Sequence, residues 1–209
     1  MGAGSADTER RIRGSRVLVI LSGRLGLEVL HGLLDDGLMH IVAAGSDIPG
    51  TDGRVTVLRK EPNAMDSWNY DLIICCLGDA GKRLYVNSRA KEYRIPLIDG
   101  TVDGGRGRIQ TVLPEGPCLE CGLDRSRRTS SKAAASEPDS GAVAETARII
   151  REEALKILAG EADRCLKGII YYDSEEGTSS VLPMGKDPKC PHHANERPVR
   201  RVVPDMYRK

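Results

Sequence analysis

Two pairs of possible metal ligands lie far apart in the chain. Cys118 and Cys121 are two residues apart in the Pro/Gly-rich stretch P-E-G-P-C-L-E-C-G, and Cys190 and His193 have the same spacing in D-P-K-C-P-H-H. Three thiolates and one imidazole form a closed tetrahedral ligand set for Zn²⁺ and leave no position for water. The pattern therefore predicts a structural zinc knuckle that fixes the C-terminal segment to the rest of the chain. His192 is an alternative to His193, and the sequence leaves that choice open.

A second group of residues could bind phosphate. The stretch L-S-G-R-L-G follows the apolar run R-V-L-V-I-L, so Gly23 and Gly26 retain the last two glycines of G-x-G-x-x-G, while Leu21 occupies the first place. Backbone N–H groups and a helix N-terminus at such a strand-to-helix turn bind phosphate groups. Arg24, in the same turn, could also reach a phosphate. By itself this pattern is equally typical of an ordinary turn.

The other elements must position these two groups. Apolar β-branched runs, typical of strands buried on both faces, alternate with helical patterns. The predicted strands are 16–21, 39–44, 54–58, 71–77 and 95–99. The predicted helices lie in 22–37, with Gly37 as the C-cap, and in 80–93. This alternation predicts an α/β fold with a Rossmann-like, mainly parallel sheet.

The pattern changes after residue 100. Residues 104–114 (G-G-R-G-R-I-Q-T-V-L-P) alternate like an antiparallel strand, an amphipathic helix is predicted over 142–159, and a hairpin over 167–183. We therefore expect an antiparallel C-terminal extension of the sheet. The predicted organisation is an N-terminal arm (1–15), one domain (16–193) with a mobile crossover loop (124–141), and a C-terminal tail (194–209).

The composition argues against nucleic-acid binding and against a membrane location. The net charge is +1, and there is no Phe and only one Trp, so neither a basic surface nor aromatic stacking favours nucleic acid. No apolar run resembles a signal peptide or a membrane helix, so we expect a cytoplasmic protein without a membrane partner. Cys75 and Cys76 lie in an apolar run and are expected to be small buried residues of a strand.

Two longer stretches carry a family resemblance. D-L-I-I-C-C-L-G-D-A-G-K-R-L-Y-V-N (71–87) and I-P-L-I-D-G-T-V-D-G-G-R-G-R-I-Q-T-V-L-P-E-G-P-C-L-E-C (95–121), closed by K-C-P, resemble the E1-like family of ThiF/MoeB-type adenylyltransferases, the catalytic core of ubiquitin-activating enzymes. The likeness is strongest over 71–121 and extends loosely over 10–193. It implies ATP binding at the first strand-to-helix turn and activation of a carboxylate as its acyl-adenylate, with release of pyrophosphate.

The resemblance also assigns roles to residues. Gly23 and Gly26 would line the ATP phosphates, and Arg83 and Asn87 match the family's arginine and asparagine on the helix after the fourth strand. The family's metal-holding carboxylate is displaced by one residue, so Asp79 would have to bind Mg²⁺.

The N-terminal arm is expected to act between two copies of the chain. An arginine of the family's arm reaches the ATP of the partner subunit, and Arg10, Arg11 or Arg13 could do so here, with Arg11 the leading candidate. That role would make the enzyme a homodimer.

The chain departs from the family in three further places. Asp47 is the nearest substitute for the acidic residue that holds the ribose. The segment with the family's catalytic arginine and lysine is largely missing, which leaves Arg54, Arg59 and Lys60 as the nearby cations. The crossover loop has no cysteine for a thioester, so the adenylate would pass to a separate acyl-accepting enzyme.

Several functions remain open. The carboxylate could be the C-terminus of a ubiquitin-like sulfur carrier or a small cofactor precursor, such as the guanylylpyridinol of [Fe]-hydrogenase cofactor biosynthesis, which the short chain favours. A non-catalytic E1-like scaffold that binds a partner protein is the main alternative, and an NAD-dependent oxidoreductase is a third. Arg106 and Arg108 could bind an anionic substrate or face solvent.

Overall fold

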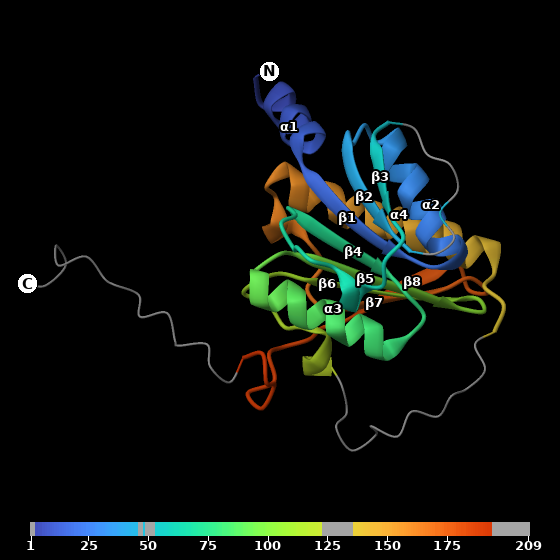
Figure 1. Ribbon diagram of the computed structural model, residues 1–209. Coiled ribbons are helices and arrows are strands. Elements are labelled where there is room, and N and C mark those ends of the chain that lie inside the picture. Colours follow the sequence, from blue (N-terminus) through green and yellow to red (C-terminus); the bar gives the residue numbers. More distant parts are fainter. Residues whose placement is uncertain (1–2, 46–47, 49–52, 123–135, 194–209) are drawn as a thin grey trace, which may run out of the picture.

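The structure is a computed structural model that describes residues 3–45, 48, 53–122 and 136–193. Its centre is one eight-stranded sheet with the order β3-β2-β1-β4-β5-β6-β7-β8 (Figure 1). The strands are β1 (Arg16–Leu21), β2 (His40–Ala44), β3 (Val55–Leu58), β4 (Leu72–Cys76), β5 (Leu97–Asp103), β6 (Arg106–Val112), β7 (Ile169–Asp173) and β8 (Thr178–Leu182). The α-helices of the described residues are α1 (Ala3–Gly14), α2 (Gly23–Asp35), α3 (Ala80–Tyr93) and α4 (Ser140–Ala159).

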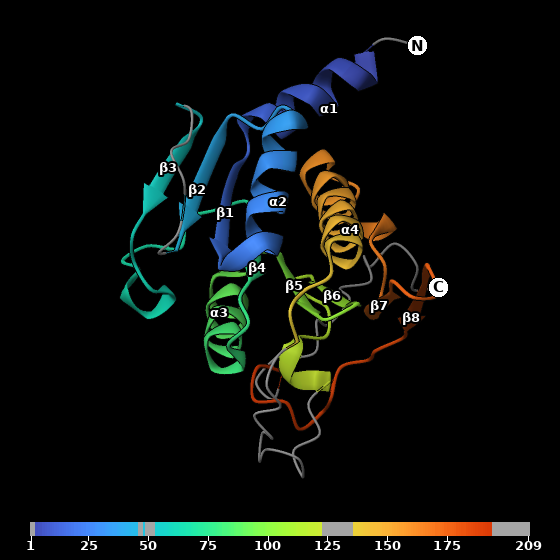
Figure 2. The same cartoon turned by 90° about the vertical axis from the view of Figure 1, so that its right-hand side faces the viewer.

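The first five strands form the predicted parallel sheet. β1 lies at its centre, between β2 and β4 and parallel to both. Successive residues of β1 point to opposite faces, so Val17 and Val19 pack into the core beneath α2 and α4, whereas Leu18 and Ile20 pack into the core beneath α3. Figure 2 shows α2 and α4 on one side of the sheet and α3 on the other. The prediction of a Rossmann-like fold is confirmed.

The last three strands form the predicted antiparallel extension. β5 turns back into β6, and β7 and β8 follow as a hairpin, each antiparallel to its neighbour. α4 covers one face of β5, β6 and β7. The opposite face of the hairpin leaves Tyr171 and Leu182 exposed.

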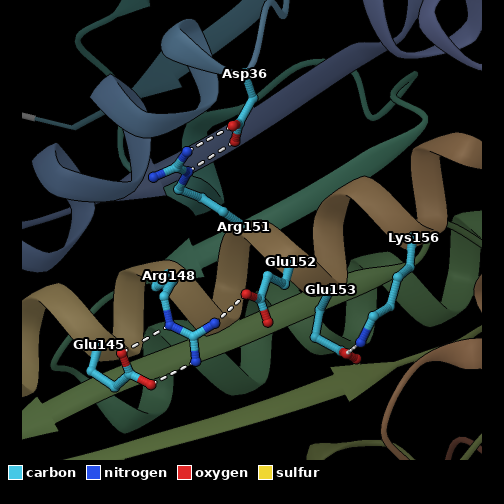
Figure 3. Close-up of polar contacts among 7 residues, drawn as sticks. All are labelled: Asp36, Glu145, Arg148, Arg151, Glu152, Glu153 and Lys156. Atoms are coloured by element: carbon cyan, nitrogen blue, oxygen red, sulfur yellow. Dashed lines mark hydrogen bonds and ion pairs between the residues drawn. The ribbon is translucent and has the colours of Figure 1, made fainter.

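Polar contacts fix α4 in place (Figure 3). Arg151 donates two hydrogen bonds to Asp36, at the end of α2, with lengths of 2.8 and 2.7 Å. Two residues further along α4, Glu153 is 1% exposed and accepts hydrogen bonds from the Thr111 hydroxyl (2.9 Å), the Leu166 N–H (3.0 Å) and Lys156 Nζ (2.6 Å). α4 is therefore attached to α2, to β6 and to the segment before β7.

Most of the predicted N-terminal arm is an α-helix, α1, that leads into the amino end of β1 (Figure 1). Most of the predicted crossover loop (residues 124–135 of 124–141) and the predicted tail (194–209) lie outside the described residues. Among the helices that the structure describes, none combines the length and the apolar character that a membrane crossing requires.

Candidate nucleotide cleft and metal site

A cleft opens at the carboxyl ends of β1, β4 and β5, where ligands bind in open α/β sheets. It encloses about 170 Å³ and is lined by the first turn of α2 and by strand ends, with Ser22, Gly23, Arg24, Gly78, Thr101 and Pro138 among its residues. Pockets that enclose a whole drug-sized ligand measure roughly 300–1,000 Å³. The cleft therefore fits part of a nucleotide, such as its phosphate groups.

The two glycines of the predicted motif have different physical roles. Gly23 has a φ of +67°, a left-handed conformation that costs other residues free energy. A Cβ atom on Gly26 would lie 2.3 Å from Leu21 Cβ, so only glycine lets α2 pack this closely on β1. Gly23 lines the cleft, whereas Gly26 holds the helix against the strand below it.

The first turn of α2 presents N–H groups to the cleft. Ser22 is the N-cap residue but makes no side-chain capping bond, and its own N–H donates to the Cys76 carbonyl at 3.1 Å. The N–H groups of a helix's first turn have no partner within the helix, so they favour an anion. Arg24 is exposed and lines the same cleft, and it adds a positive charge.

Asp79 lies beside the cleft, directly after Gly78. Its Oδ1 accepts the Lys82 N–H at 2.7 Å and so caps α3, and the residue is exposed. A carboxylate that uses one oxygen as a cap can still offer the other oxygen to Mg²⁺, a cation that prefers oxygen ligands and keeps several waters.

Arg83 lies outside the residues that line the cleft. It donates from Nε to Asp99 Oδ1 at 2.9 Å and also forms an ion pair with Asp99 Oδ2. Asp99 is fully buried and also accepts from Arg108 at 3.2 Å. Sequence reasoning missed this carboxylate, although an Asp at the end of the apolar run I-P-L-I is a signal of a partnered buried charge.

Cys75 and Cys76 are buried in β4, as predicted. Burial raises the pKa of both thiols, and the nearby Asp99 carboxylate raises it further. Both side chains therefore remain neutral thiols and act as small apolar residues of the core.

Asn87 is fully buried on α3, with its contacts at the metal site rather than at the cleft. Its Oδ1 accepts the Leu119 N–H at 3.0 Å. Burial raises the pKa of the Cys118 thiol, and the nearby Asn87 side chain acts in the opposite direction. The described contacts of Asn87 therefore position the Cys118–Cys121 turn.

Other predicted site residues lie away from the cleft. Arg11 contacts the last turn of α4, because a Cβ on Gly160 would lie 2.5 Å from its guanidinium. α1 precedes β1 and the cleft follows it, so the six residues of β1 separate Arg11 from Arg24 by about 20 Å. Arg54 donates to the Leu34 carbonyl at the end of α2, and Lys60 pairs with Asp66. Asp47 lies outside the described residues.

The structure brings the four predicted metal ligands together. One donor atom from each of Cys118, Cys121, Cys190 and His193 lies within 4.8 Å of the others. Cys118 Sγ is 3.9 Å from Cys121 Sγ and 3.5 Å from Cys190 Sγ. Tetrahedral Zn–S bonds of 2.3 Å place two sulfurs about 3.8 Å apart, so the cluster fits this ion.

The two turns of the metal site are built alike. The Cys121 N–H donates to the Cys118 carbonyl and the His193 N–H to the Cys190 carbonyl, each at 3.0 Å. His192, the alternative ligand, instead contacts Glu120 at 2.9 Å. Burial raises the pKa of the Cys190 thiol to about 12, so a metal ion would have to displace its proton.

Comparisons with known proteins identify the family. The ThiF family model matches residues 49–192, more than half of the chain. The chain belongs to the ThiF family of E1-like adenylyltransferases. Over 182 residues it is 24% identical to the SAMP-activating enzyme E1 of Haloferax volcanii, which covers 83% of this chain and 67% of that protein.

Two further similarities agree with this assignment. The chain is 24% identical over 233 residues to MoeZ of Mycobacterium tuberculosis, named as a probable adenylyltransferase/sulfurtransferase, with 88% of this chain and 58% of that one covered. It shares its fold with Escherichia coli MccB, crystallised with AMPCPP and MccA, at a TM-score of 0.76 and 14% identity, covering 93% of this chain and 70% of that one. The chain spans between 58% and 67% of these two curated relatives.

Proposed function

We propose that this ThiF-family chain binds ATP and Mg²⁺ at the cleft and adenylylates a carboxylate, with release of pyrophosphate. The observation that carries the proposal is the set of phosphate-binding groups at the carboxyl end of β1: the uncapped first turn of α2, Gly23 and Arg24. Hydrogen-bond donors and a cation aimed at phosphate oxygens stabilise the charge that develops on the leaving pyrophosphate.

In this proposal Asp79 would hold Mg²⁺ beside the phosphates. The metal would neutralise charge on the phosphate oxygens. Arg83 would act indirectly, because its guanidinium is paired with the buried Asp99. Asp47 remains the proposed partner of the ribose.

We propose that the substrate is a carboxylate on a small cofactor precursor, such as a guanylylpyridinol, or at the C-terminus of a ubiquitin-like sulfur carrier. Relatives whose names include an E1 enzyme and an adenylyltransferase/sulfurtransferase support a carboxylate in general. The adenylate would then pass to an acyl-accepting enzyme.

The proposed enzyme is a homodimer. Arg11 lies at the opposite end of β1 from its own cleft, about 20 Å away. An arginine side chain is too short to cover that distance, so any contact between Arg11 and ATP requires a second copy of the chain.

We further propose that the four-ligand cluster holds a structural Zn²⁺. All four positions would be filled by protein atoms, so the ion would take no part in the reaction. It would join the segment after β8 to the turn that follows β6.

ATP–pyrophosphate exchange tests the proposed activity. The full chain, loaded with Zn²⁺, would be given ATP, Mg²⁺, labelled pyrophosphate and a panel of carboxylates that includes peptides ending in Gly-Gly and aromatic acids. The proposal predicts exchange that depends on one class of carboxylate and is lost in Asp79→Asn. ATP binding without exchange for any member of the panel would instead favour the alternative function.

That alternative is a non-catalytic E1-like scaffold. One observation favours it: of the cations predicted for the site, Arg83 is paired with Asp99 and Arg54 with the end of α2. Among the residues that line the cleft, Arg24 supplies the positive charge.

A further inference from the structure

A second cavity lies on the other side of the α3 N-terminus from the nucleotide cleft. It encloses about 260 Å³ between α3, β6, β7 and the Cys118–Cys121 turn, and shares no lining residue with the cleft. Its walls include the side chains of Arg83, Leu84, Arg108, Leu119, Ile169 and Tyr171. We call it the arginine pocket.

The two arginines give the pocket a net positive charge. Both bind the carboxylate of Asp99, which is fully buried, so two guanidinium groups share one negative charge. Their side chains are 17% and 27% exposed, which leaves both accessible from the pocket. Since their contacts with Asp99 hold both guanidinium groups in place, the arginines are preorganised and would lose little conformational entropy on binding a ligand.

Both arginines have hydrogen-bond donors left over. Arg83 directs two N–H groups at Asp99, whereas Arg108 directs one at Asp99 and one at Gln110. A guanidinium has five N–H donors, so about six remain between the two side chains. Paired guanidinium groups recognise carboxylates and phosphates with strong, directional hydrogen bonds.

The remainder of the pocket is suited to an apolar body. Leu84, Leu119 and Ile169 supply apolar surface, and Tyr171, a residue that is 41% exposed, supplies an aromatic ring. A ligand with one anionic group on an apolar or aromatic body matches both parts of the pocket.

We propose that the arginine pocket binds an organic anion, with its charged group between Arg83 and Arg108. Gly78 lines the nucleotide cleft and Ala80 the arginine pocket, so their Cα atoms lie at most about 7.6 Å apart. If the adenylylation proposed above holds, the ligand is the acyl substrate. That substrate then carries, besides the carboxylate that is activated, a second anionic group that the pocket retains.

Benzoate is the first probe of this pocket. The full chain would be titrated with benzoate while NMR follows the Nε–Hε signals of its arginines. The proposal predicts saturable shifts of Arg83 and Arg108, and at least a tenfold weaker affinity in Arg108→Gln. Arg106→Gln is the matched control, because Arg106 lies two residues away on the same face of β6, is 80% exposed and pairs with Asp173. It should change the affinity less than twofold.

A second variant tests the pocket without removing a charge. Leu84→Trp fills the pocket and leaves every charge in place, so it should also abolish the benzoate shifts. Equal weakening by Arg106→Gln and Arg108→Gln, or full affinity in Leu84→Trp, would refute the proposal. ATP titration of the same samples tests the cleft separately. Benzoate binding without ATP binding would support the proposed anion site and contradict the proposed adenylylation. ATP binding without benzoate binding would contradict the proposed anion site alone.

Discussion

Glu153 and Glu152 are adjacent on α4, but their loss should have very different effects on stability. Glu153 is buried and accepts hydrogen bonds from Thr111, Leu166 and Lys156, whereas Glu152 is 52% exposed and pairs with Arg148 (Figure 3). Replacement of Glu153 by Ala leaves a buried hydroxyl and a backbone N–H without their acceptor and Lys156 without its partner.

The size of the effect follows from these contacts. A hydrogen bond to a charged group contributes about 1.5–3 kcal/mol to stability. The ion pair with Lys156 contributes less, because the Lys156 side chain is 28% exposed and solvent screens the interaction. We therefore expect Glu153→Ala to lower the free energy of unfolding by about 3–5 kcal/mol. Glu152→Ala should lower it by less than about 1 kcal/mol, because exposed ion pairs contribute little.

Urea unfolding of the two variants and the wild type, followed by circular dichroism, measures both values. Glu153→Gln keeps the size of the side chain but replaces one acceptor oxygen by an N–H donor, so it should lie between the other two. A Glu153→Ala value within about 0.5 kcal/mol of Glu152→Ala would refute this account of how α4 is held.

Three further predictions concern Gly26, Asn87 and Cys165. Gly26→Ala should lower the free energy of unfolding in urea by about 1–3 kcal/mol or more, because its Cβ would meet Leu21 Cβ at 2.3 Å. Gly78→Ala should leave the stability unchanged, because a Cβ there meets nothing within 4 Å. Equal effects of the two substitutions would contradict this packing. Asn87→Leu should weaken metal binding about 10–100-fold, as substitution of other residues that position metal ligands does, and should leave the ATP affinity unchanged. Competition between the protein and a chelator for Co²⁺, followed by the Co²⁺ absorption spectrum, measures the metal affinity. A loss of ATP affinity alone would instead favour the role predicted from the family resemblance. Burial raises the pKa of Cys165 to about 12, so the thiol stays protonated at pH 8 and should resist iodoacetamide in the native chain; rapid alkylation there would contradict its burial.

The sequence predicts the sheet well because its signals are local. The apolar run Arg16–Leu21 and the glycine-rich turn after it form the strand and cleft they predict. Equal spacing and Pro/Gly-rich turns likewise indicate the four metal ligands, although 72 positions separate Cys118 from Cys190. The choice between His192 and His193 needed coordinates, because it depends on which ring faces the cysteines and which faces Glu120.

The roles of charged residues were less predictable. Arg83 and Arg108 lie 25 positions apart in the sequence and meet only because Asp99 is buried between them, a contact that depends on the packing of α3 on β5 and β6. Asn87 matches the family's motif, yet its side chain accepts the Leu119 N–H and lies near enough to Cys118 to affect the pKa of that thiol. Local patterns predict elements, whereas a charged or amide side chain takes its partners from the tertiary fold.

Isothermal titration with ATP and Mg²⁺ measures whether the nucleotide binds at the first turn of α2. The full chain would be compared with Arg24→Ala and with Arg164→Ala, which removes the same charge from an exposed ion pair after α4. We expect ATP to bind the wild type and Arg164→Ala with equal affinity, and Arg24→Ala at least tenfold more weakly. Absence of ATP binding, or equal affinity in all three, would contradict the placement of the nucleotide at the first turn of α2.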